Sequence, residues 1–133
     1  MADISVTAAS VVKVAGANVE VGVAGATITA GQVLYLDSNN LLQLADADAS
    51  GKTTVAGIAL HGASANQPLA YLTGGDLTFN AVLTSGTIYT LSDTAGGIRP
   101  AVDDNSGDTI SVLGVATSTT NLRVKIHNSG GVL

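Results

Sequence analysis

Two stretches of eleven residues decide the fold class, and they are similar to each other. Residues 26–36 read ATITAGQVLYL, and residues 81–91 read AVLTSGTIYTL, an offset of 55. In each stretch a Gly leads into a run of β-branched, aliphatic and aromatic residues, which is typical of a turn that enters a strand. The similarity continues in the same order with Ser-Gly at 50–51 and 106–107, Gly-aliphatic-Ala at 57–59 and 114–116, and Gly-Gly at 74–75 and 130–131. We therefore predict two similar units of about 50 residues.

Strand patterns also occur before and after these stretches. Val19, Val21 and Val23 alternate with Asn18, Glu20 and Gly22, and this period of two predicts a half-buried strand with the valines on the buried side. The run 122–127 alternates in the same way. Residues 41–49 are the one segment that favours helix, and we expect one turn there at most. The pattern predicts an all-β fold, a small barrel or sandwich.

The repeat also predicts the domain organisation. Two units are too few for a solenoid, so we expect the apolar faces of 25–75 and 80–131 to pack about a pseudo-two-fold axis into one core, within a domain spanning 25–133. Residues 1–24 form an N-terminal arm and a linking strand. Because an unpaired strand is an aggregation hazard, we expect this arm to pair with its own body or with a neighbouring protein.

Composition excludes several classes of function. The 133 residues carry a net charge of −5, with a pI near 4.5, which argues against a protein that coats nucleic acid or anionic lipid. The first residues lack the charged and apolar regions of a signal peptide, so we expect synthesis in the cytoplasm. No apolar run is long enough to cross a bilayer. Thiolate chemistry is excluded because the chain has no Cys.

Metal and phosphate motifs are incomplete. Residues 46–51 read D-x-D-x-S-G, like the start of a calcium loop, but the twelfth position is Gly57 instead of an acidic bidentate ligand. We expect a turn in which carboxylates accept backbone N–H groups, and no metal. The fragment SGKT at 50–53 has Asp46 where a phosphate-binding loop needs its first Gly, so we expect no nucleotide either.

Catalytic residues are also not suggested. His61 and His127 are the two histidines, both at strand ends, and neither lies near a G-x-S-x-G motif. We expect structural roles for both, no enzymatic activity, no cofactor and no small-molecule substrate.

One face of the last strand is cationic, with Arg123, Lys125 and His127 opposite three aliphatic residues. Two interpretations stay open. The stripe is either a solvated face that discourages edge pairing or a docking stripe for an acidic neighbour.

The unit as a whole resembles a known family. Residues 24–36 read A-G-x-x-I-x-x-G-x-V-L followed by Tyr35 and Leu36, and a G-I-A strand at 57–59 and an apolar strand with a Gly-Gly turn at 71–77 follow. This pattern is similar to bacteriophage capsid decoration, or cement, proteins over residues 24–80, with a weaker copy through Gly131. The double copy and the strand-like segment 18–23 depart from the family pattern.

The resemblance implies a homotrimeric structural protein on the outer surface of the virion, made in the host cytoplasm. It would bind the major capsid protein and stabilise the contacts between its copies. In relatives the N-terminal arm makes the capsid contact, which implies partner-binding roles for Ile4, Val6, Val11, Val12 and Val14.

An alternative is a receptor- or carbohydrate-binding module, or the base of a head fibre or tail appendage. A carbohydrate-binding module stacks sugars on exposed aromatic rings. Tyr35, Tyr71, Tyr89 and Phe79 all lie within apolar strand patterns, so we expect them in the core.

Overall fold

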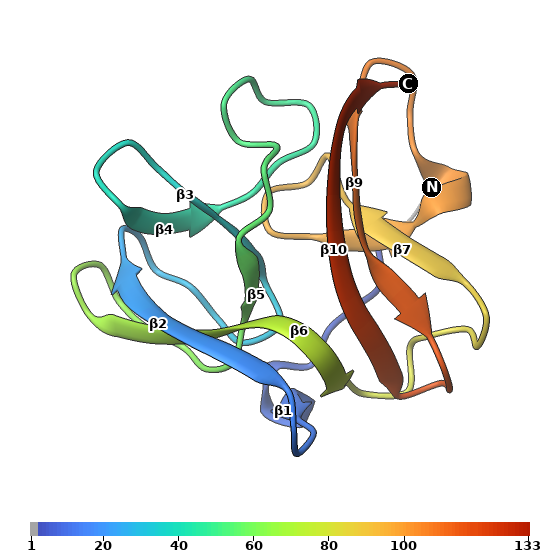
Figure 1. Ribbon diagram of the computed structural model, residues 1–133, viewed down its shortest axis with the longest axis horizontal. Helices are drawn as coiled ribbons and strands as arrows, with labels where there is room; N and C mark the ends of the chain where they lie inside the picture. Colours follow the sequence, from blue (N-terminus) through green and yellow to red (C-terminus); the bar gives the residue numbers. More distant parts are fainter. Residues whose placement is uncertain (1–2) are drawn as a thin grey trace.

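The chain folds almost entirely into β-strands, as predicted. The computed structural model describes residues 3–133 and contains ten strands and two short 3-10 helices, Ala8–Ser10 and Ala101–Asp103 (Figure 1). Strand β4 occupies the start of the segment 41–49, where we expected at most one helical turn. The strands are β1 (Val12–Lys13), β2 (Asn18–Ala24), β3 (Val33–Leu36), β4 (Leu41–Leu44), β5 (Gly57–Ala59), β6 (Pro68–Thr78), β7 (Ile88–Leu91), β8 (Ile98–Pro100), β9 (Thr109–Ala116) and β10 (Asn121–Val132).

The strand order shows the internal duplication directly. It runs β2-β4-β3-β5-β6-β10-β9-β7-β8, with β6 and β10 antiparallel at the junction of the two units. If β3 to β6 are exchanged for β7 to β10, the order β4-β3-β5-β6-β10-β9-β7-β8 becomes the same order read from its other end. The two units are therefore related by a pseudo-two-fold axis that passes between β6 and β10, and Figure 1 shows them as the left and right halves of the molecule.

Strand register agrees with the sequence offsets. Val33 faces Ile58 in the first unit, and Ile88 faces Val115 in the second. These pairs differ by the offsets of 55 and 57 at which the two stretches of sequence match. The similarity between the halves is thus a similarity of strand pairing.

The turn glycines are equivalent as well. Gly31 and Gly86 have φ angles of +88° and +84°, a left-handed backbone conformation that residues other than Gly rarely adopt. Their N–H groups donate to the carbonyl oxygens of Ala59 and Ala116, at 2.8 and 2.7 Å. The same turn therefore places the first strand of each unit beside its third.

One sequence match is wrong. Tyr71 faces Ala59, and Leu122 faces Ala116, so Tyr71 and Leu122 are the equivalent residues. The Gly-Gly pairs at 74–75 and 130–131 therefore do not correspond. The reason is that the connection between β9 and β10 is shorter than the one between β5 and β6.

The interior contains two apolar clusters, one formed by residues of both units and one inside the first unit alone. Strand β2 pairs with both β4 and β6, so that β2-β4-β3-β5-β6 closes into a ring. Successive residues of a strand point to opposite faces, and Val33 accordingly packs outside this ring and Leu34 inside it. The inner cluster holds Ala24, Ile28, Leu34, Leu42, Ala59, Ala63, Leu69 and Tyr71. The shared cluster, between the units, includes Val33, Ile58, Leu72, Leu77, Phe79, Tyr89, Leu91, Ile98, Leu113, Leu122 and Val124.

The ring also reverses the predicted orientation of β2. Val21 is 70% exposed and Val23 39% exposed, and Gly22 and Ala24 face the interior. A Cβ atom at Gly22 would lie 3.0 Å from Leu42 Cδ1, because the large side chains of the other strands already fill the ring. The interior has room only for small residues on β2, so the valines point outward.

Backbone hydrogen bonds join the two units. Ala47 N–H donates to Ser92 O at 3.0 Å, and Thr109 N–H donates to Ala47 O at 2.9 Å. The Asn128 side chain on β10 accepts from Val55 N–H at 2.8 Å and donates to Val55 O at 3.1 Å. The connection between β4 and β5 is thereby bound to the second unit.

No helix within residues 3–133 has the length and apolar character to span a membrane.

Candidate docking surface

The beginning of the N-terminal arm lies against its own body. Ile4 N–H donates to Ile98 O of β8 at 2.9 Å. Val6 packs over Gly31, where a Cβ atom would come within 2.5 Å of Val6 Cγ1. Val11 is 7% exposed and belongs to the shared core. Three of the five arm residues that we predicted to bind a partner therefore contact this chain's own units, and Met1 and Ala2 of the arm lie outside the described residues.

Polar contacts fasten the arm across the junction of the units. Asn80, which lies between β6 and β7, accepts from Thr7 N–H at 2.8 Å and donates to Ser5 O at 2.9 Å. Asp3 accepts a hydrogen bond from Ser92 Oγ in the second unit. The described part of the arm thus runs from β8, past Asn80, to β1 on the edge of β6.

The remaining two arm residues are exposed on an outer face formed by three strands. Residues that face each other across antiparallel strands point to the same side. Thr78 of β6 faces Val12 of β1 and Asn121 of β10, and Asp76 faces Arg123. Val14 N–H donates to the backbone oxygen of Asp76 at 3.0 Å and continues the β1 register.

We call this surface the β1–β6–β10 face and define it by Val12, Val14, Asp76, Arg123 and Lys125. Val12 is 58% exposed and Val14 is 37% exposed. Leu77, Leu122 and Val124 point to the opposite side and are buried. The alternation predicted for the last strand is therefore confirmed, with cations outside and aliphatic residues inside.

A hollow lies in this face between the β1–β2 connection and β10. It has a volume of about 380 Å³ and is lined by residues 15–17, by Gly75 and Asp76, and by residues 123–125. Gly75 has φ +104°, and a Cβ atom there would lie 2.7 Å from Ala17 Cα. Only Gly permits this approach of the connection to β6, so Gly75 shapes the hollow.

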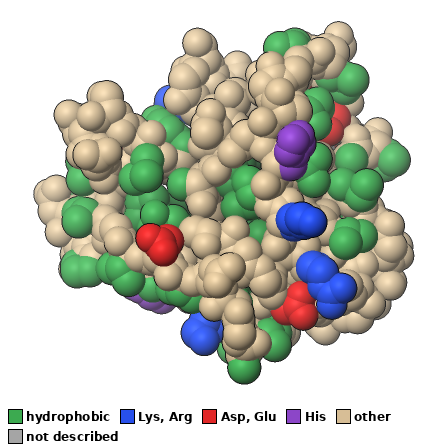
Figure 2. Space-filling view, viewed as in Figure 1, with side chains coloured by type: hydrophobic (Ala, Val, Ile, Leu, Met, Phe, Trp, Pro, Cys, Tyr) green, Lys and Arg blue, Asp and Glu red, His purple; other side chains and the backbone are tan. Residues whose placement is uncertain are grey.

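The β1–β6–β10 face is locally basic on an acidic protein. Figure 2 shows a line of basic and histidine side chains over β10, the strand of Arg123, Lys125 and His127, all exposed. Arg123 Nε lies 3.3 Å from Asp76 Oδ1. Arg123 is 63% exposed at its side chain, and such exposed pairs contribute only about 0–1 kcal/mol. Within residues 3–133 the ion pairs are made by Arg99 and Arg123, so Lys125 has no acidic partner there.

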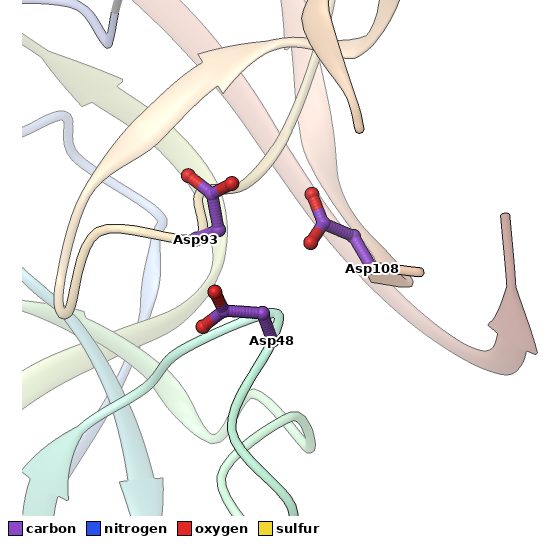
Figure 3. Close-up of side chains that lie close together, drawn as sticks. All are labelled: Asp48, Asp93 and Asp108. Carbon is purple, nitrogen blue, oxygen red and sulfur yellow. The ribbon is translucent and has the colours of Figure 1, made fainter. Parts of the chain in front are cut away.

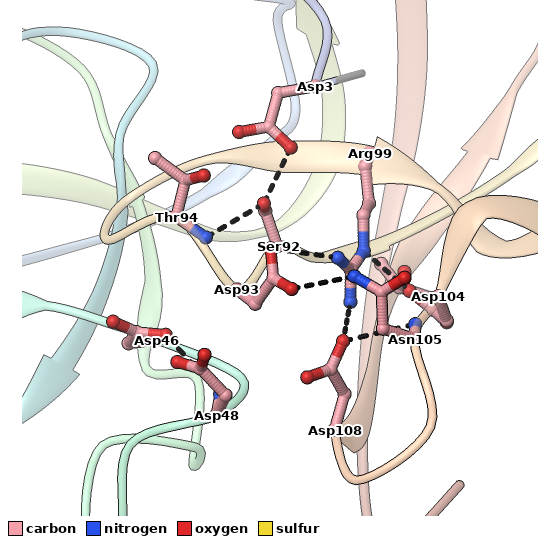
Figure 4. A network of polar contacts seen from close by, with 11 residues as sticks. Asp3, Asp46, Asp48, Ser92, Asp93, Thr94, Arg99, Asp104, Asn105 and Asp108 are labelled. Atoms are coloured by element: carbon pink, nitrogen blue, oxygen red, sulfur yellow. Dashed lines mark hydrogen bonds and ion pairs between the residues drawn. The ribbon is translucent and has the colours of Figure 1, made fainter. Parts of the chain in front are cut away.

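A second polar cluster surrounds Arg99, the middle residue of β8 (Figure 4). Arg99 is 1% exposed, and its guanidinium binds Asp93 at 3.0 Å, Asp104 at 2.8 Å, and Asp108. Burial alone would lower the pKa of Arg99, but the hydrogen bonds to Asp108 and Asp104 raise it above its ordinary value. The guanidinium is thus held in its charged form inside the protein.

The same cluster lowers the pKa of one of its acids. Asn105 donates to Asp93 at 2.7 Å. This hydrogen bond, followed by those from Arg99, holds the pKa of Asp93 below its ordinary value. Asp93 and Arg99 bracket the turn between β7 and β8, so the cluster also fixes that turn.

In the first unit a neutral side chain, Gln43, stands where the second unit has Arg99. Gln43 Nε2 donates to Asp37 Oδ2 at 3.0 Å across the β3–β4 turn, and Gln43 and Arg99 occupy equivalent register positions. Asp37 also accepts from the N–H groups of Asn39 and Leu41. At the equivalent place the second unit replaces Gln by Arg and adds two acids.

The two Asp-rich loops meet beside Arg99. Carboxylate oxygens of Asp48, Asp93 and Asp108 all lie within 4.8 Å of one another (Figure 3). Carboxylate oxygens gathered in this way are ligands of hard cations such as calcium. Asp93 and Asp108, however, already bind the guanidinium of Arg99, which supplies positive charge between them.

The local geometry of the first loop is a turn. Asp46 Oδ1 accepts from Asp48 N–H at 3.3 Å, as expected for the D-x-D-x-S-G segment. Burial, followed by the neighbouring Asp48, raises the pKa of Asp46. The meeting of the two loops was not predicted, because nothing within either loop encodes its distance from the other.

His61 has a structural position. Its Nε2 accepts from Ala70 N–H at 3.0 Å, which leaves Nδ1 to donate to Gly62 O at 2.9 Å. These two bonds use both ring nitrogens of a neutral imidazole. His61 therefore fastens the connection between β5 and β6, and His127 lies exposed on β10.

A scan against protein-family models found no family that matches this chain, and a search of curated proteins also found no match.

Proposed function

We propose that this protein is a structural component of a phage virion that binds the outer surface of the capsid and stabilises contacts between major capsid proteins. The proposal includes a homotrimeric assembly on the virion surface, synthesis in the host cytoplasm, and no enzymatic activity. The observation that carries it is the β1–β6–β10 face, where the exposed side chains of Val12 and Val14 lie on the same side as the exposed cations Arg123 and Lys125. The sequence resemblance over residues 24–80 points to the same role.

The construction of the body suits a protein that must resist mechanical load. The arm crosses the junction of the units, and the loop between β4 and β5 binds the second unit through Asn128. The backbone bonds of Ala47 to Ser92 and Thr109 hold the other end of that loop. A clamp between capsid proteins needs such a body because it transmits force without opening.

The carbohydrate-binding alternative has less support from the aromatic residues. Tyr71, Tyr89 and Phe79 are 8%, 1% and 2% exposed, and Tyr35 is half-buried against the shared core. Sugar stacking needs an exposed ring face. Binding on a glycan array would favour this alternative over the proposed function.

The experiment adds purified protein to phage heads assembled without it and measures co-sedimentation and the thermal resistance of the heads. We expect saturable binding and more heat-resistant heads. Failure of the wild-type protein to co-sediment would refute the proposed function. Sedimentation equilibrium of the free protein tests the trimer.

Point variants assign binding to the arm without removing residues 3–11, which are packed on the body. Val12→Asp and Val14→Asp introduce charge at exposed positions and should reduce head occupancy. Val21→Asp is the matched control, because Val21 is 70% exposed on β2, outside the face. Equal occupancy for all three variants would contradict a role for the arm.

A further inference from the structure

We propose that the hollow of the β1–β6–β10 face receives an acidic side chain from an acidic segment of the capsid protein. This inference rests on the proposed function and names the chemistry of its partner. It assigns the two binding groups as the guanidinium of Arg123 and the ammonium of Lys125, with Val12 and Val14 beside them.

Charge complementarity is the first argument. The protein carries −5 overall, and Arg99, one of its five Lys and Arg residues, is buried. Two of the four exposed cations, Arg123 and Lys125, line the same hollow. Opposite charges across an interface orient the partners and raise the association rate, and the rest of the acidic surface would repel an acidic segment that approached elsewhere.

The state of these two cations is the second argument. Lys125 has no acidic partner within residues 3–133. Arg123 is bound to Asp76 by a single long contact of 3.3 Å at an exposed position, which costs little to exchange. Asp76 holds Arg123 at the edge of the hollow, and a partner carboxylate can take its place.

The shape and composition of the face favour a protein partner over nucleic acid. The hollow, of about 380 Å³, is at the small end of the range of roughly 300–1,000 Å³ typical of binding pockets. Exposed Val12 and Val14 lie on the same face, where Val14 N–H binds the backbone of Asp76, and apolar contacts beside a few charges are typical of protein interfaces. Nucleic-acid binding depends on many phosphate contacts, which two cations beside a carboxylate do not provide.

Three variants of the full-length protein test the inference on the same phage heads. Arg123→Glu/Lys125→Glu reverses the charge of the hollow, and we expect at least about a tenfold loss of affinity. Asp76→Asn removes the competing carboxylate, keeps the backbone bond to Val14, and should increase affinity. Lys52→Glu reverses one cation, half of the charge change of the double variant, at an exposed site in the β4–β5 connection, and should bind as the wild type once the change in net charge is screened by salt.

Salt dependence provides a second measurement. Raising the ionic strength from about 0.01 M to about 0.15 M shortens the Debye length from roughly 30 to 8 Å. We expect this to weaken wild-type binding and to affect the Arg123→Glu/Lys125→Glu variant less. Thermal melts of all variants should match the wild type, since the four substituted positions lie outside the core.

The outcomes separate the two proposals. Wild-type protein that does not bind heads refutes the proposed function and this inference together. If the wild-type protein binds heads and Arg123→Glu/Lys125→Glu binds equally well, only the inference is refuted. The same holds if Asp76→Asn binds more weakly than the wild type. If free duplex DNA retains the wild-type protein but not the charge-reversed variant, the partner is nucleic acid. This result would also overturn the inference.

Discussion

Replacing Arg99 by Met should destabilise the protein more than any other single exchange of a charged residue. The side chain is 1% exposed, and the side chains of Asp104 and Asp108 are 4% exposed. Met has a similar length but no charge, so these carboxylates would stay buried without their counterion. The cost therefore comes from the acids that remain, not from lost apolar packing.

The magnitude follows from the burial of these groups. Removing one partner of a buried ion pair costs about 3–5 kcal/mol. For 133 residues the entropy of unfolding is about 0.28 kcal/mol/K near the melting temperature. A loss of about 4 kcal/mol then lowers the Tm by roughly 14 °C. Arg99→Lys keeps the charge without the planar fork, and should give a smaller loss.

Differential scanning calorimetry at pH 7 measures this loss, and the chain supplies its own control. Arg123→Met removes an exposed guanidinium with a single contact to Asp76, so it should cost less than about 1 kcal/mol. If Arg99→Met and Arg123→Met lower the Tm by the same amount, the cluster does not stabilise the fold as argued.

Three further predictions test other parts of the structure. Gly31→Ala and Gly86→Ala should each lower the free energy of unfolding by about 1–2 kcal/mol, because Ala is strained in the left-handed conformation. Gly31→Ala should cost about 1–3 kcal/mol more, because its Cβ atom would meet Val6. Equal Tm losses in thermal melts would contradict the packing of the arm on Gly31. Val21→Ser should change the free energy of unfolding by less than about 0.5 kcal/mol, whereas Gly22→Val should cost about 1–3 kcal/mol against the filled ring; urea unfolding distinguishes this from the opposite orientation of β2. Asp46→Asn should stabilise the protein at pH 7, because the raised pKa of Asp46 means that its charged form is disfavoured in the folded state. The gain in stability should vanish below about pH 3, where the carboxyl is protonated in both the folded and the unfolded state. A gain that persists in acid would refute this explanation.

The second unit should also show acid sensitivity through Asp93. Its folded-state pKa lies below the ordinary value of 3.8, so its contribution to stability is present above about pH 4 and is lost as the pH falls through the lowered pKa. Asp93→Asn should remove this part of the acid dependence, as measured by urea unfolding between about pH 2 and pH 5. An unchanged pH profile would contradict the assignment.

Much of the fold could be predicted because its determinants are local. The turn glycines Gly31 and Gly86, followed by β-branched and aromatic runs, predicted both equivalent turns and their strands. The alternation in 122–127 predicted which side chains of β10 are exposed. The Gly-Gly match failed because a shared dipeptide says nothing of the length of the connection before it.

The candidate site could be predicted only in its parts. Two separate features stood out in the sequence, the arm with Val12 and Val14 and the cationic stripe with Arg123 and Lys125. Val14 and Arg123 are 109 residues apart in the sequence. Their union on one face depends on β6, which pairs with β1 and β10 at the same level. Asp76 and Gly75, which complete the hollow, had no signal of their own beyond a turn-like dipeptide.

By itself the sequence determined the all-β class, the two units and the turns that begin them, because strand period and turn chemistry depend on residues close together in the chain. Tertiary structure alone decided that β2 turns its valines outward, that the arm's first residues lie on their own body, and that Arg99 gathers acids from the loops around it. These features depend on which space the other strands leave free and on which loops they bring together. Such distances are set by the packing of the whole chain, and no local pattern encodes them.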